Sequence, residues 1–120
     1  MREVHTPPQR ALLDRWIQMS DEALADANSQ RLSDQTRASV AFHSGYMCAL
    51  FLVGPDALKL DSEHPSQKVL RQAAKIANVD VGPGLLHLQR LLDDPVSMPR
   101  SHVMLAWAKE MRALVPSDRT

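Results

Sequence analysis

The stretch RASVAFHSGYMCALFLVG, residues 37–54, contains the longest apolar run of the chain. Every position from Tyr46 to Val53 is apolar, so a helix here is hydrophobic on all sides. Such a helix is either enclosed by protein or spans a bilayer. Spanning needs about 20 apolar residues, and this run is too short because Arg37 and His43 precede it. The stretch therefore predicts a buried central helix.

The composition predicts that this helix belongs to a single helical domain, residues 1–120. A chain of 120 residues can bury a core without disulfides or metals. Its 44% hydrophobic and 23% charged residues are typical of a globular protein. Leu, Ala and Met supply most of the apolar residues, and these favour helix over strand.

Proline, glycine and capping residues divide the chain into five expected helices, at about 8–28, 33–54, 65–78, 84–93 and 101–114. Residues 56–67 are expected to form a loop with at most a short helical turn. Ser33 and Ser101 are the expected caps of the second and last helices. Each of the last three helices has an expected apolar face: Val69, Leu70, Ala73, Ile76 and Ala77; then Leu85, Leu86, Leu88, Leu91 and Leu92; then Val103, Trp107, Met111 and Leu114.

These elements predict an all-α fold, an antiparallel bundle of about five helices with the second helix buried at its centre. No run of residues shows the period-two alternation of a strand.

Net charge and cysteine content limit the classes of partner. Fourteen basic and fourteen acidic side chains cancel, so no overall charge attracts nucleic acid or anionic lipid. The single cysteine, Cys48, lies in the apolar run and is expected to be a buried thiol in a reducing compartment. The first ten residues lack the apolar segment of a secretory signal. We therefore expect a cytoplasmic protein without a membrane partner.

The usual catalytic and ligand-binding motifs do not occur in the sequence. The five histidines show no zinc-binding spacing, and no second cysteine is present. Neither a phosphate-binding glycine loop nor a Gly-x-Ser-x-Gly elbow is found. We therefore expect no metal and no cofactor.

Arg37 and His43 form the most interesting pair of polar residues. An arginine binds phosphate and a histidine transfers protons near neutral pH, so together they suit cleavage of RNA through its 2′-hydroxyl. However, six residues at about 100° each place the two side chains about 120° apart on one helix. The favoured interpretation is structural: Arg37 pairs with a carboxylate such as Asp34, and His43 is a hydrogen-bonded, half-buried side chain.

Lys68, Arg71 and Lys75 follow one another at spacings of three and four residues on the third helix. Such a stripe suits contact with nucleic-acid phosphates. A solvated outer helix face is the commoner interpretation of such a stripe, and no aromatic residues are interleaved with these three charges.

The sequence of residues 32–54, LSDQTRASVAFHSGYMCALFLVG, resembles the central helix of HEPN-like domains. Ser33, Arg37 and Ala41 match the pattern Ser-x-x-x-Arg-x-x-x-Ala of that helix. Residues 63–74, EHPSQKVLRQAA, are similar to the histidine-led start of the next helix in some subfamilies.

This resemblance implies an antiparallel helical bundle, often dimeric, associated with RNA, nucleotides or toxin–antitoxin pairs. Active members carry an Arg-x4–6-His motif toward the end of the domain. Here Arg100 and His102 are only two residues apart, and the one pair with matching spacing, Arg37 and His43, lies in the central helix. This departure from the family pattern favours a non-catalytic member, or an unrelated bundle of similar composition.

The leading functional expectation is a small helical binding protein that acts as a homodimer or with a partner protein and is not an enzyme. The alternative is a HEPN-type ribonuclease or nucleotide-binding protein that uses Arg37 and His43.

The buried-helix prediction is testable by truncating its leucines. Leu50→Ala and Leu52→Ala are each expected to lower the free energy of unfolding by about 2–5 kcal/mol, because each leaves a core cavity. Urea denaturation of the two variants measures this loss, and a loss near zero contradicts the prediction.

Overall fold

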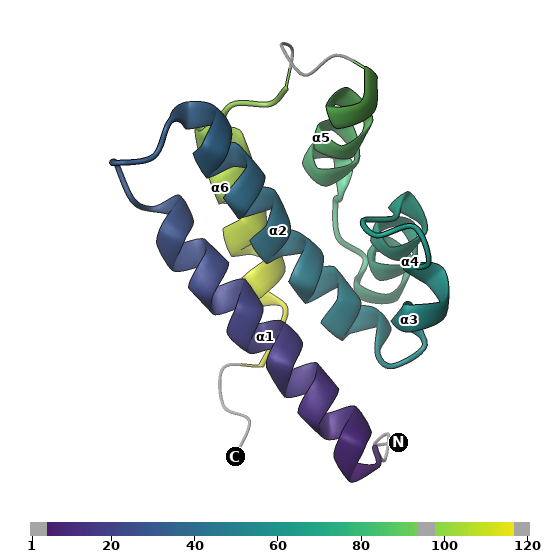
Figure 1. Cartoon of the computed structure of the whole chain (residues 1–120). Coiled ribbons are helices and arrows are strands. Elements are labelled where there is room, and N and C mark those ends of the chain that lie inside the picture. Colours follow the sequence, from purple (N-terminus) through teal and green to yellow (C-terminus); the bar gives the residue numbers. More distant parts are fainter. Residues whose placement is uncertain (1–4, 94–97, 117–120) are drawn as a thin grey trace.

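The computed structural model describes residues 5–93 and 98–116, and all of its regular elements are helices. The helices are α1 (Pro7–Ala27), α2 (Asp34–Val53), α3 (Ala57–Leu60), α4 (Gln67–Ala77), α5 (Gly82–Asp93) and α6 (Ser101–Ala113), as Figure 1 shows. The described residues contain no strand, which confirms the all-α prediction. Helix α3 is the short helical turn that the sequence analysis allows within the loop of residues 56–67.

Local sequence explains where most helices begin and end. The Thr6 hydroxyl accepts the N–H of Gln9 at 3.2 Å, and the Gln9 side chain accepts the N–H of Thr6 at 2.9 Å, a capping box. Ser33 caps α2 as predicted, because its hydroxyl accepts the N–H of Thr36 at 3.1 Å. Asn78, in the left-handed conformation, ends α4.

The predicted cap of α6 is wrong. Ser101 is the first residue of that helix, and the preceding Arg100 makes no capping hydrogen bond with its side chain. Instead, the Ser101 hydroxyl donates to the Asp34 carboxylate of α2 at 2.5 Å, and the Ser101 N–H donates to it at 3.3 Å. The hydrogen bond from the hydroxyl, with smaller contributions from the backbone N–H and nearby arginines, lowers the pKa of Asp34.

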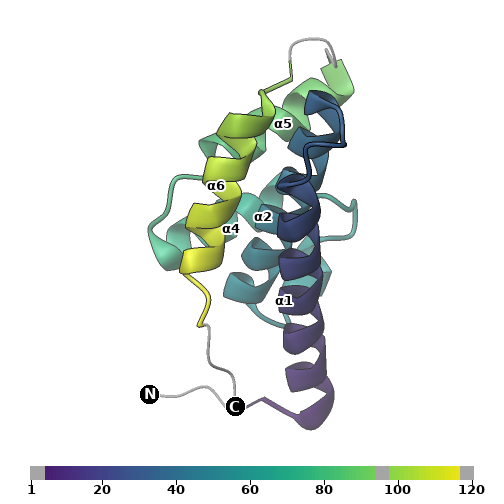
Figure 2. The ribbon, with the colours of Figure 1, turned by 90° about the vertical axis from the view of Figure 1, so that its left-hand side faces the viewer.

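This contact shows that α2 and α6 begin at the same end of the molecule and run in the same direction. Helix α1 runs antiparallel to α2 along another side, while α3, α4 and α5 lie beyond α2, as Figures 1 and 2 show. The connection through these three helices returns the chain to the end where α2 starts, which allows α6 to run parallel to it.

Helix α2 is the centre of the fold, since it contacts each of the other five helices. Its residues from Tyr46 to Leu50 are buried, as predicted. Its last three residues, Phe51, Leu52 and Val53, pack against the core but are partly exposed. Because Leu52 is only partly buried, Leu52→Ala is expected to destabilise the protein less than Leu50→Ala.

The indole ring of Trp107 fills a slot formed by two glycines of neighbouring helices. Gly45 of α2 lies against one part of the ring and Gly84 of α5 against another. A Cβ atom added at Gly84 would lie 2.6 Å from two ring atoms, and one added at Gly45 would overlap the same ring. The indole N–H donates to the Asp80 carbonyl at 3.2 Å. Trp107 therefore joins α6 to both α2 and α5.

The slot predicts that Gly45→Ala destabilises the protein by about 1–3 kcal/mol through overpacking. The direction of this change distinguishes overpacking from the usual effect of the substitution, because alanine in place of glycine inside a helix otherwise stabilises by about 0.5–1 kcal/mol. Thermal and urea unfolding measure the change, and Gly82→Ala on the exposed first turn of α5 is the control. In the double variant Gly45→Ala/Trp107→Leu, the loss of unfolding free energy should be smaller than the sum of the two single losses, because the smaller side chain makes room for the added methyl group. If the losses are strictly additive, the packing of Trp107 against Gly45 is contradicted.

Candidate functional site

The structure places Arg37 in a structural role at the junction of α1 and α2. Its side chain is half-buried, and its Nε–H donates to the carbonyl of Ala27, the last residue of α1, at 3.0 Å. A cation at a helix C-terminus also matches the negative end of the helix dipole. Its charge lowers the pKa of Asp34 as a minor contribution.

His43 lies elsewhere, in a groove between α1 and α2. This α1–α2 groove has a volume of about 620 Å³ and is lined by Arg15, Met19, Glu22, Ala23, Asp26, Gln35, Thr36, Ser39, Val40 and His43. Arg37 does not line it. Burial lowers the pKa of the half-buried His43, and the neighbouring His64 contributes in the same direction. The structure therefore does not bring Arg37 and His43 to one site.

The arginine that shares the groove with His43 is Arg15, which the sequence analysis did not single out. The two residues are far apart in the sequence and on different helices. A usable signal exists on α1 itself: Arg15, Met19, Glu22 and Asp26 follow at spacings of four, three and four residues, which places them on one face.

A second polar cluster surrounds the hydroxyl of Tyr46, near the end of α2. The hydroxyl donates to Asp61 and accepts the N–H of Ser66, the latter at 2.7 Å. The other oxygen of Asp61 lies 2.7 Å from Nδ1 of His64. Burial, followed by the contact with Asp61, raises the pKa of Tyr46 above its usual range.

An Asp–His pair of this kind orients an imidazole, as in hydrolase triads. Among the described residues, however, the His64 ring has a hydrogen bond with Asp61 alone, so no nucleophile is bound to it. We therefore assign Asp61 and His64 to fixing the segment between α3 and α4 against α2.

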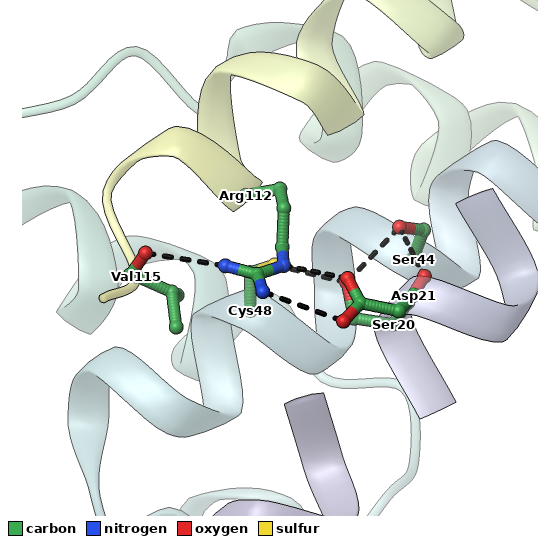
Figure 3. A network of polar contacts seen from close by, with 6 residues as sticks. All are labelled: Ser20, Asp21, Ser44, Cys48, Arg112 and Val115. Atoms are coloured by element: carbon green, nitrogen blue, oxygen red, sulfur yellow. Dashed lines mark hydrogen bonds and ion pairs between the residues drawn. The ribbon is translucent and has the colours of Figure 1, made fainter. Parts of the chain in front are cut away.

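The thiol of Cys48 belongs to a buried polar network, which Figure 3 shows. The Ser20 hydroxyl lies 3.1 Å from Sγ of Cys48 and 3.1 Å from the Ser44 hydroxyl. Beside this network, Arg112 donates to both carboxylate oxygens of Asp21, at 2.6 and 3.3 Å. Burial raises the pKa of Cys48 to about 11, so the thiol stays neutral and is a core residue as expected.

Within residues 5–93 and 98–116, no three His, Cys, Asp or Glu side chains are grouped so that they could hold a metal ion. None of the helices in the same ranges is long and apolar enough to cross a bilayer.

The basic stripe of α4 borders a second groove, between α4 and α5. This α4–α5 groove consists of two adjoining hollows of about 410 and 600 Å³, and Arg71 and Leu85 line both. Lys75 lines the larger hollow, whereas Lys68 is exposed outside the groove. The apolar residues of the groove are Ala74, Val79, Val81, Leu85, Leu88 and Leu92, and its polar residues are Gln67, Arg71, Lys75, Asp80, Gln89 and Asp93.

Helix α5 carries more leucines than its packing uses. Its buried residues are Gly84, His87 and Leu88. Leu92 is 80% exposed, and Leu86 and Leu91 are also exposed. The expected apolar residues of this helix are therefore only partly buried. Ile76 of α4, Val103 of α6 and Leu114, which directly follows α6, are exposed as well.

His87 is buried against Phe42, with ring centroids 4.6 Å apart and nearly parallel planes. Its Nδ1 atom has no hydrogen-bond partner among the described residues. Because burial disfavours the charged imidazole, the pKa of His87 falls from 6.5 to about 4.

Comparisons with protein-family models, with curated proteins and with solved structures found no match.

The buried His87 predicts that the protein loses stability in mild acid. Between pH 6.5 and about 4 the unfolded chain binds a proton at this residue and the folded chain does not, so the free energy of unfolding falls as the pH is lowered. The loss through this residue is expected to reach about 2–3 kcal/mol. Urea unfolding across this pH range measures it.

His87→Phe, which keeps a stacked ring, should flatten this pH dependence. His102→Gln is the control, because His102 is exposed on α6. An unchanged slope in His87→Phe contradicts the assignment.

Proposed function

We propose that this chain is a non-catalytic, HEPN-like helical binding protein that holds an amphipathic helix of a partner protein in the α4–α5 groove. The observation that carries the proposal is that Leu92, which lines the groove beside Leu85 and Leu88, is 80% exposed. Covering a leucine of this kind contributes about 1.5–3 kcal/mol to binding.

The residues beside Leu92 support a binding surface. Leu85 and Leu88 line the same hollow, together with polar residues of α4 and α5. Exposed apolar surface with a polar rim marks sites of interaction. Outside the groove, Ile76 on α4 and Leu86 and Leu91 on α5 are also 53%, 41% and 46% exposed. A groove between two helices suits a third helix that inserts apolar side chains at positions i, i+3 or i+4, and i+7.

The charges along the groove favour an acidic partner helix over nucleic acid. Arg71 and Lys75 stand on the α4 side, where they would meet carboxylates on the flank of a bound helix. Asp80 and Asp93 line the same groove, and their carboxylates repel a phosphate backbone. Arg71 and Lys75 are thus better suited to carboxylates on one flank of a peptide than to a continuous run of phosphates, and Lys68 lies outside the groove.

The surroundings of Arg37 support the non-catalytic half of the proposal. The guanidinium of Arg37 donates a hydrogen bond to the Ala27 carbonyl, and Arg37 does not line the groove that contains His43. Cleavage of RNA needs both groups at one phosphate. The reduced, buried Cys48 fits a cytoplasmic location, which we include in the proposal.

Binding of designed peptides tests this proposal. Two helical peptides would share leucines at i, i+3 and i+7 and carry either glutamates or lysines on the flank. We expect the glutamate peptide to bind more tightly by fluorescence anisotropy. Leu92→Asp should raise its dissociation constant by about tenfold or more, and Arg71→Glu should reverse the preference between the two peptides.

Leu58→Asp is the matched control, because Leu58 is 57% exposed on α3 and does not line the groove. The proposal fails if neither peptide binds, or if Leu58→Asp weakens binding as much as Leu92→Asp. It also fails if single-stranded RNA binds and Arg71→Glu abolishes that binding.

A further inference from the structure

We propose that two copies of this chain pair through the α1–α2 groove, around a two-fold axis that exchanges ion pairs between Arg15 and Asp26. This surface is separate from the α4–α5 groove, since α1 lies along a different side of α2 from α4 and α5 (Figure 1).

Along α1 the residues that line the groove change from basic to acidic. Arg15 comes first, Met19 follows, and Glu22 and Asp26 come last. At 100° per residue all four fall within an arc of about 60°, and so form one straight stripe. The stripe is therefore positive at one end and negative at the other.

Both charges at the ends of the stripe lack partners within the described residues. Arg15 and Asp26 are exposed, and neither side chain takes part in a hydrogen bond or an ion pair. By contrast, Glu22 accepts a hydrogen bond from Gln18 at 3.3 Å. Arg15 and Asp26 are thus free to pair with another molecule.

An antiparallel copy of α1 supplies the matching charges in the correct order. When the axis passes between Met19 and Glu22, Arg15 of one copy lies level with Asp26 of the partner subunit, and the reverse pair forms by symmetry. The two pairs are separated along the helix by about 16 Å, the rise of eleven residues. Each copy contributes one basic and one acidic end, so the surface complements itself.

The centre of the groove is suited to the apolar part of such an interface. Met19 and Val40 are half-buried and pack against the core, and Ala23 lies buried between the charged ends. An apolar centre with charges at its rim is the usual anatomy of a protein interface. A partner helix of uniform charge would meet a like charge at one end, which favours a second copy of this chain.

Charge reversal tests the pairing directly. Arg15→Asp places two acids opposite each other at both ends, and Asp26→Arg places two arginines there. Each is expected to raise the dimer dissociation constant by about tenfold or more. The double variant Arg15→Asp/Asp26→Arg should recover wild-type dimerisation, and a mixture of the two single variants should form a mixed dimer.

Sedimentation velocity over a range of protein concentrations measures the oligomeric state, with circular dichroism to confirm that each variant folds. Arg10→Asp is the matched control, because Arg10 is exposed on the same helix but does not line the groove. A monomeric wild type at the highest concentration, a double variant as monomeric as the single ones, or an equal effect of Arg10→Asp overturns the inference.

The outcome is separable from that of the proposed function. Leu92→Asp should remain dimeric, and the monomeric Arg15→Asp variant should still bind the glutamate peptide. Loss of peptide binding in Arg15→Asp, with dimerisation also lost, contradicts the assignment of two separate surfaces.

Discussion

The packing of Trp107 between Gly45 and Gly84 is the contact on which the arrangement of the outer helices depends. The ring occupies space that any side chain at either glycine would fill, so α2, α5 and α6 approach more closely than ordinary core residues allow. The indole N–H also holds the Asp80 carbonyl, just before α5 begins. The Trp107 side chain therefore sets both the position of α5 and the distance between α6 and α2.

Polar contacts fix α6 at its two ends, on either side of this packed ring. At the start of the helix, Asp34 accepts hydrogen bonds from Ser101, and near its end Arg112 pairs with Asp21 of α1. Helices α1, α2 and α6 thus form one unit joined by both apolar and polar contacts. Helix α5 has fewer buried side chains, and its exposed leucines remain available to a partner.

The two grooves differ in chemistry in a way that suits two kinds of partner. The α4–α5 groove combines exposed leucines with basic residues on one side, which matches an acidic amphipathic helix. Along the α1–α2 groove the charges of α1 change from basic to acidic, which matches an inverted copy of itself. Because the two grooves lie on different sides of α2, a dimer formed through the α1–α2 groove would leave the α4–α5 groove exposed on each subunit.

The sequence by itself determined the helical fold, most helix boundaries and the central place of α2, because caps and apolar periodicity act over a few residues. It did not determine which side chains would meet across the fold. Asp34 caps a helix that starts 67 residues later, and Arg15 rather than Arg37 shares a groove with His43. Periodicity likewise identified Leu92 as apolar but not as exposed, since an apolar face is buried only where the tertiary structure brings another helix to cover it.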